Sequence, residues 1–222
     1  MTARSAATRA KLIAVAERLF ATRGIDGVTL NEIGGAAGQR NAAVCQYHFG
    51  NKEGLLQAII DKHVPGIAAR RYALLDELEQ AGHRSLRDVV RVLIAPVADK
   101  LRDPDGGRDF IRIDAQLVAV HTVSIQHIGP SPLKVPTADR LTRTLLEAMK
   151  PFGLPEAVVK QRAMLAAVLL FHGLADHLRM LEAATRADES MNTDLFLLTL
   201  EDAIVALLSG GLERPTSEGR AP

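Results

Sequence analysis

The first part of the chain carries apolar side chains at helical spacing. Between residues 6 and 23 they recur every three or four positions, at Leu12, Val15, Ala16, Leu19 and Phe20. A stripe of this period predicts an amphipathic helix, and Gly24 directly after it is a typical helix stop. We therefore expect one helix from about residue 6 to residue 23.

Three shorter helical signals follow. Thr29 and Glu32 have the spacing of a capping box, in which each side chain bonds the backbone of the other residue, so a helix should begin directly after Thr29. It should end near Gly38, because glycine readily adopts the positive φ of a sharp turn. A third helix is predicted over about residues 40–47, and Asn51 is a typical N-cap for a fourth.

Two short helices joined by a tight glycine turn form a helix-turn-helix, whose second helix enters the major groove of DNA. Arginine is suited to guanine, asparagine and glutamine are suited to adenine, and small side chains let the helix approach the base edges. Aromatic, imidazole and ammonium groups beyond them can reach phosphates. We expect DNA contacts from Thr29, Arg40, Asn41, Ala43, Gln46, Tyr47, His48 and Lys52.

Charge is distributed unevenly along the chain. Residues 1–52 contain seven basic and three acidic side chains, a balance of +4, whereas the whole chain of 222 residues has a net charge of only +1. A basic head on a weakly acidic body is typical of a protein whose one end meets a polyanion. Charge and motif together favour double-stranded DNA as a partner.

These residues resemble the DNA-binding domain of the TetR family of bacterial transcriptional regulators. The resemblance covers about residues 8–60 and rests on Phe20 with Gly24, Thr29 to Ile33, Ala36 to Gly38, and Tyr47 to Leu56. Between Gly38 and Phe49 the chain has one residue more than the commonest family pattern. The resemblance implies an all-helical homodimer whose variable body binds a small molecule and whose DNA binding most often represses transcription. Activation in place of repression stays open.

The rest of the chain predicts a helical bundle. Segments of roughly 13 to 30 residues lie between clusters of Pro, Gly and polar residues, the first at Pro65. We expect an all-α fold with a three-helix helix-turn-helix domain over residues 1–50 and a bundle for ligand binding and dimerisation over residues 51–212. Residues 213–222 should fray.

The last two long helices, predicted over residues 156–184 and 194–208, should form a dimer interface. Only Thr199, Glu201 and Asp202 interrupt the apolar surface of the second helix. A helix this apolar needs a partner on its outer side. A two-fold dimer supplies that partner, and would present two recognition helices to half-sites about 34–36 Å apart.

A small-molecule pocket is also expected in the body. Its predicted lining is mostly apolar, with two polar side chains: Phe110, Ile113, Gln116, Leu117, Val120, His121 and Phe171. Such a mixture is typical of small-molecule sites, although each apolar residue taken alone is more often core. Few charged residues lie on this predicted helix, which favours an apolar or amphipathic effector.

Other classes of function find little support in the chain. The apolar stretch over residues 163–175 is shorter than the roughly 20 residues that span a bilayer, and no signal-peptide core precedes it, so we expect a cytoplasmic protein without a membrane partner. The seven His and the single Cys45 do not have metal-ligand spacing, and no catalytic motif occurs. We expect no metal, no cofactor and no enzymatic activity. The alternative is a helical protein-interaction module without sequence-specific DNA binding.

Overall fold

The computed structural model describes residues 2–41, 43–82, 85–126, 133, 139–183 and 192–211, with the backbone alone for residues 119–126. Within these ranges every regular element is helical, which confirms the expected all-α class. The elements are α1 (Ala3–Arg23), α2 (Leu30–Ala36), α3 (Val44–Phe49), α4 (Lys52–Gln80), α5 (Leu86–Ala98), the 3₁₀ helix η1 (Asp99–Arg102), α6 (Gly107–Gln126), α7 (Asp139–Met149), the 3₁₀ helix η2 (Lys150–Phe152), α8 (Glu156–Ala183) and α9 (Thr193–Ser209). The expected tail over residues 213–222 lies outside the described residues.

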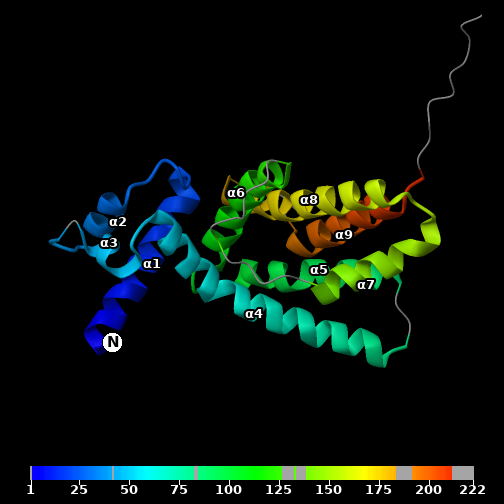
Figure 1. Cartoon of the computed structure of the whole chain (residues 1–222), viewed down its shortest axis with the longest axis horizontal. Helices are drawn as coiled ribbons and strands as arrows, with labels where there is room; N and C mark the ends of the chain where they lie inside the picture. The colour runs from blue at the N-terminus through cyan, green and yellow to red at the C-terminus, as the bar shows by residue number, and fades with distance from the viewer. Residues whose placement is uncertain are drawn as a thin grey trace, which may run out of the picture.

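The first three helices form a unit of their own at one end of an elongated molecule (Figure 1). The stripe predicted on α1 is the centre of its core, and residues from α2, α3 and the start of α4 close around it. The fully buried members of this core include Leu12, Ala16, Phe20, Val28, Ile33, Cys45, Leu55 and Ile59. This burial fixes how α2 and α3 sit against α1.

α4 continues through Pro65, where the sequence predicts a break. Proline lacks an N–H, so the carbonyl of Asp61, four residues earlier, loses its helical partner. Both residues are exposed, and water can satisfy that carbonyl. Buried residues on either side, Ile60 and Ile67, hold the helix on the molecule. A single helix of 29 residues therefore connects the N-terminal unit to the body.

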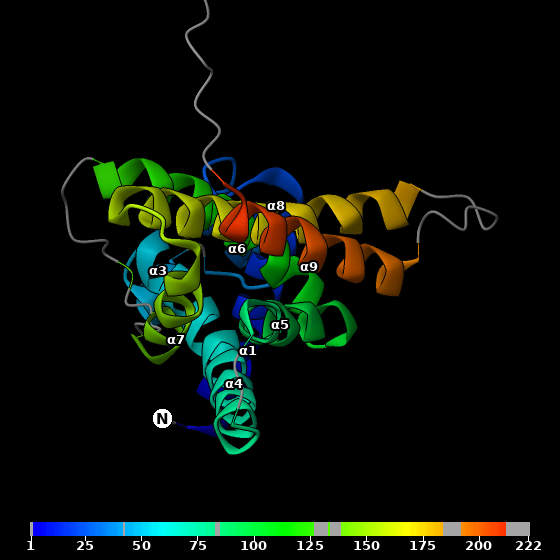
Figure 2. The ribbon, with the colours of Figure 1, turned by 90° about the vertical axis from the view of Figure 1, so that its right-hand side faces the viewer.

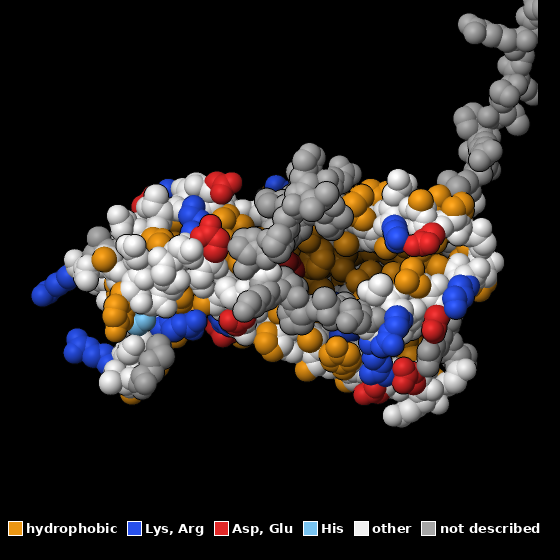
Figure 3. Space-filling view, in the orientation of Figure 1, with side chains coloured by type: hydrophobic (Ala, Val, Ile, Leu, Met, Phe, Trp, Pro, Cys, Tyr) orange, Lys and Arg blue, Asp and Glu red, His pale blue; other side chains and the backbone are white. Residues whose placement is uncertain are grey.

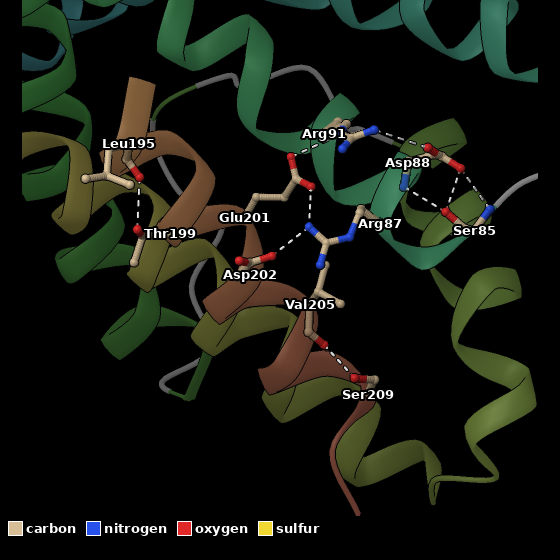
Figure 4. Close-up of polar contacts among 10 residues, drawn as sticks. All are labelled: Ser85, Arg87, Asp88, Arg91, Leu195, Thr199, Glu201, Asp202, Val205 and Ser209. Atoms are coloured by element: carbon tan, nitrogen blue, oxygen red, sulfur yellow. Dashed lines mark hydrogen bonds and ion pairs between the residues drawn. The ribbon is translucent and has the colours of Figure 1, made fainter. Parts of the chain in front are cut away.

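The body is built from α5 to α9. Seen after a quarter turn, α8 and α9 run side by side, with α5, α7 and α4 beneath them (Figure 2). The buried carboxylate of Glu201 joins two of these layers, because it accepts hydrogen bonds from Arg87 Nη1 at 2.6 Å and from Arg91 Nε at 3.0 Å (Figure 4). Arg87 also reaches Asp202 at 2.7 Å. This network connects α9 to α5.

Among the described helices, α8 is the one long and apolar enough to cross a membrane by length and composition. It packs instead along α6 and α9. Asp176 and Arg179 of α8 form an ion pair on its surface.

Candidate nucleic-acid interface

The start of α2 is fixed by the capping box that the sequence predicts. Thr29 Oγ1 accepts from the Glu32 N–H at 3.3 Å, and Glu32 Oε2 accepts from the Thr29 N–H at 2.8 Å. Arg23 at the end of α1 also reaches Glu32 Oε1 at 2.7 Å. The Arg23 hydrogen bond, with those from Thr29, lowers the pKa of the Glu32 carboxyl to about 2. The carboxylate is therefore charged at physiological pH and ties α1 to α2.

The turn after α2 is a glycine turn, as predicted. Gly38 has a φ of 70°, in the left-handed region where a side chain is strained. Its N–H bonds the Gly35 carbonyl at 2.9 Å, and the Gln39 N–H bonds the Gly34 carbonyl at 3.0 Å. The chain thus leaves α2 sharply and moves towards α3.

The recognition helix differs from the expected range of residues 40–47, because α3 begins at Val44 and ends at Phe49. Arg40 and Asn41 precede it in the connecting segment. Asn41 Oδ1 accepts from the Ala43 N–H at 2.9 Å, a local bond that favours a turn over a helix. The helix is therefore shorter than predicted. Arg40 and Asn41 lie in the loop before it and not on the helix itself.

One face of α3 is open to solvent. Cys45 is buried under the helix, whereas Gln46 is exposed and Tyr47 is 82% exposed. His48 is partly buried, and its ring meets the Tyr47 ring edge-on at 5.1 Å. Arg40, Asn41 and Ala43 are also exposed. The turn and the outer face of α3 together carry exposed side chains that could enter a DNA groove.

Two predicted DNA contacts are engaged inside the protein. The Lys52 ammonium donates to the Ile25 carbonyl at 2.9 Å, which ties the start of α4 to the loop after α1. The Thr29 hydroxyl is occupied in the capping box, where it also donates to Glu32 Oε2 at 2.8 Å. One of the three N–H donors of Lys52 is thus used within the fold, and its contact with a phosphate stays a prediction.

Sequence reasoning missed Lys11. This exposed residue of α1 lies beside the glycine turn, since a Cβ placed on Gly38 would be 3.8 Å from Lys11 Nζ. Its position on α1 at the edge of the apolar stripe, one turn before Val15, was visible in the sequence. The sequence did not show which element Lys11 would face, because that depends on how α1 packs against the glycine turn. Lys11 adds positive charge next to the proposed groove-facing surface.

The residues predicted to line a ligand pocket are placed in different surroundings. Phe110, Ile113 and Leu117 are buried core residues of α6, and Phe110 stacks on His63 with ring centroids 4.5 Å apart. Phe171 is partly buried and packs against the core. Val120 and His121 are on α6, but their side chains lie outside the described residues.

Gln116 bonds the N-terminal unit, and its predicted contact with a ligand stays a prediction. Its Oε1 accepts from the Ile25 N–H at 2.9 Å, and its Nε2 donates to the Phe20 carbonyl at 3.1 Å. Both partners belong to the N-terminal unit. The structure therefore uses Gln116 to connect the body to the DNA-facing end.

Two grooves with described linings lie away from these predicted pocket residues. One, of about 350 Å³, lies between α5 and α9 and is lined by Arg91, Ile94, Ala95, Ala98, Asp194, Leu197, Leu198 and Glu201. The other, of about 490 Å³, lies between α1 and α4 and is lined by Ala6, Arg9, Ala10, Ile13, Ala14, Ala58, Asp61, Lys62 and Asp105. The predicted pocket residues meet in neither of them.

Comparison with known proteins finds a family match for the N-terminal segment. Residues 12–59 match the family described as bacterial regulatory proteins, tetR family. A probable HTH-type transcriptional regulator, ArpR of Pseudomonas putida, is 39% identical over 77 residues, which make up 34% of this chain and 36% of that protein. The matched segment thus spans about a third of the length of that relative.

Two solved structures resemble the chain over most of its length. One is a putative TetR-family transcriptional regulator from Rhodococcus sp., 20% identical, with a TM-score of 0.42, covering 91% of this chain and 98% of that one. The other is a gamma-butyrolactone receptor described as ArpA-like, 22% identical, with a TM-score of 0.42, covering 93% of this chain and 84% of that one. At these scores the likeness in overall arrangement is loose.

Proposed function

We propose that this chain, whose N-terminal segment matches the tetR family of bacterial regulatory proteins, is a ligand-responsive repressor that binds a pseudo-palindromic operator as a homodimer. The observation that supports this most is the open face of α3 behind a glycine turn, carried on a rigid core. Regulatory proteins of this family are not enzymes, which agrees with the expectation of no catalytic activity.

Base contacts would come from both the turn and the helix. Arg40 and Asn41 would reach bases from the loop, and Gln46 would reach them from α3, with Ala43 allowing close approach. Tyr47, His48 and Lys11 would contact phosphates, which position the domain without reading sequence. The exposure of these side chains supports the assignment.

The homodimer would form through α8 and α9. Large apolar side chains on these helices are half exposed: Leu165, Met180, Leu195 and Leu198. Apolar surface of this kind on two neighbouring helices favours a protein interface. A two-fold interface would set the spacing of the two α3 helices.

Effector binding would release the protein from DNA through the junction between the N-terminal unit and the body. The Gln116 bonds to Phe20 and Ile25 and the Lys52 bond to Ile25 hold the N-terminal unit on α4 and α6. An effector that favours another placement of α6 would change the distance between the two recognition helices. The operator affinity would then fall by the factor by which the effector prefers this second conformation over the DNA-binding one.

The test is selection of bound duplexes from a random DNA pool by the purified protein, followed by anisotropy at two salt concentrations. We expect an inverted repeat, and a loss of about 1–3 kcal/mol in binding free energy for Arg40→Ala or Gln46→Ala. Lys150→Ala is the matched control, because this exposed cation lies on η2, outside both the DNA-facing unit and the helices of the proposed dimer interface. Absence of any enriched sequence would favour the helical protein-interaction module instead.

A further inference from the structure

Two charged residues interrupt the buried stripes of two body helices. On α4, Arg71 lies four residues after Ile67 and four before Leu75, and both of these neighbours are buried. On α6, Asp114 lies four residues after Phe110 and three before Leu117, which are buried as well. Residues at these spacings share one helix face, so both charges sit where the helix pattern calls for apolar core.

Neither charge has a bonded partner within the described part of the chain. Arg71 Nε is the one buried side-chain nitrogen or oxygen there without a hydrogen bond. The Asp114 carboxyl forms neither a hydrogen bond nor an ion pair with the described residues. The charge of Arg71 does act on Asp114 across the gap between α4 and α6. The two groups are therefore within electrostatic reach of each other although they form no bond.

Several other polar and charged groups on the helices around α6 already have partners. These include Glu17 with His63 and Lys62, Arg112 with Glu182, Arg140 with Asp76 and Glu79, and His177 with Thr193. Removing a charge from water without a partner is strongly unfavourable. Burial raises the pKa of Asp114 to about 7, with Arg71 opposing it, and burial lowers the pKa of Arg71. Groups perturbed in this way are concentrated at functional sites.

A hollow is present in the same part of the molecule. Figure 3 shows the surface indented between α8 and the layer of α5 and α7, with an apolar floor. α6 packs along α8, and α4 packs against α5 and α6. Arg71 and Asp114 both remain partly accessible although the surrounding protein desolvates them. Side chains with both properties line an interior space.

We propose that Arg71 and Asp114 form the polar end of the effector site, and that the effector is an apolar organic acid with a hydroxyl group near its carboxylate. This inference rests on the proposed regulator function and specifies the ligand class. The carboxylate would pair with the Arg71 guanidinium and the hydroxyl would donate to Asp114, while the apolar body fills the hollow.

An acid fits this site better than an amine or a neutral alcohol. The guanidinium stays charged at any physiological pH, whereas Asp114 can take up a proton and become neutral. The positive charge is therefore the one that still requires a counter-ion. A protonated Asp114 would also donate a hydrogen bond to an anionic ligand instead of repelling it.

The experiment is calorimetric titration of the full chain with four probes of equal length: decanoate, its β-hydroxy derivative, decanol and decylamine, each below its micellar concentration. We expect the hydroxy acid to bind most tightly, decanoate next, and the other two at least tenfold more weakly than decanoate. Arg71→Met should lower the affinity for both acids at least tenfold. Arg70→Met is the matched control, because Arg70 is half exposed on the adjacent position of α4, and it should leave both affinities unchanged.

Asp114→Asn tests the hydroxyl contact. It should reduce the preference for the hydroxy acid over decanoate, with a smaller effect on decanoate itself. Arg71→Met should fold, and its apo melting temperature should equal or exceed that of the parent, because it removes a buried guanidinium without a partner. Equal binding of decylamine or decanol, or unchanged acid binding in Arg71→Met, would overturn the proposal.

The two proposals can fail separately. If the acids bind as expected but no DNA sequence is selected, the acid site stands and the regulator function is wrong. If an operator is selected but none of the four probes binds, the regulator function stands and the ligand class is wrong. If both hold, the hydroxy acid should weaken operator binding at least tenfold, and Arg71→Met should abolish that response while still binding the operator.

Discussion

The Glu17 carboxylate of α1 lies 2.8 Å from the imidazole Nε2 of His63 on α4, and both residues are 1% exposed. Lys62 Nζ bonds the second oxygen of Glu17 at 2.9 Å, and the Phe110 ring of α6 stacks on His63. A buried polar cluster therefore joins α1, α4 and α6 at the junction between the DNA-facing unit and the body. Any movement of the unit relative to the body has to rearrange these contacts.

Glu17→Ala should lower the free energy of unfolding by about 3–5 kcal/mol, because it leaves the buried His63 without its partner and leaves Lys62 with Asp105 alone. Urea denaturation measures this as a lower midpoint with an unchanged slope. The control is Asp61→Ala, which removes an exposed carboxylate bonded only to Gln57 one turn earlier, and should change stability by less than about 0.5 kcal/mol. Equal midpoints for the two variants would show that the cluster does not hold the junction.

Gln116→Ala should release the Ile25 amide, since the amide donates to Gln116 Oε1. We expect hydrogen exchange at Ile25 to accelerate by about tenfold or more, together with a loss of about 1–3 kcal/mol of stability. Gln57→Ala is the control, because Gln57 bonds Asp61 within α4 and lies away from this junction. Unchanged exchange at Ile25 would mean that the bond contributes little to the connection in solution.

Gly38→Ala should destabilise the protein by about 1–2 kcal/mol. The reason is the φ of 70°, since a Cβ there meets only Lys11 Nζ at 3.8 Å and the loss is one of backbone strain. Gly35→Ala, three residues earlier within α2, has open space around its Cβ and should stabilise the protein by up to about 1 kcal/mol. Thermal unfolding of the pair checks the sign of each change, and effects of the same sign would contradict the turn geometry.

Asp114 should make stability fall as the pH rises from about 4 to about 7. Its pKa is about 7 in the folded protein, against an ordinary 3.8, so the folded state holds a proton that the unfolded state has released in this range. Asp114→Asn removes this dependence, and its stability relative to the parent should increase across the range by at most about 4 kcal/mol. Urea midpoints at several pH values measure it. Parallel pH profiles of the parent and the variant would rule out the raised pKa.

Substitution of Leu195 and Leu198 by Lys should convert the proposed dimer to a monomer. These α9 side chains are 56% and 57% exposed, and charges placed there would remain buried in an interface. Leu146→Lys is the control, because Leu146 on α7 is 41% exposed and lies outside the proposed interface. Sedimentation at micromolar concentration distinguishes the outcomes, and a parent chain that is already monomeric would show the dimer proposal to be wrong.

The sequence by itself determined the local features of this protein. The capping box of Thr29 and Glu32, the N-cap at Asn51 and the glycine turn at Gly38 were all predictable, because each depends on residues within four positions along the chain. The apolar stripe of α1 was likewise visible from its period. These features were enough to predict an all-α chain with a helix-turn-helix and the residues that such a motif exposes.

Only the tertiary structure decided what the long-range polar groups do. Lys52 bonds the Ile25 carbonyl, 27 residues away, and Gln116 bonds the Ile25 amide, 91 residues away. The sequence indicated a phosphate contact and a pocket for these side chains, because both are plausible uses of a polar group whose neighbours in space are unknown. The electrostatic coupling of Arg71 and Asp114 has the same origin, whereas the shorter recognition helix follows from the local bond between Asn41 and Ala43. Helical periodicity indicates which face of its helix a residue occupies. Only the packing of the helices determines which residues lie opposite that face.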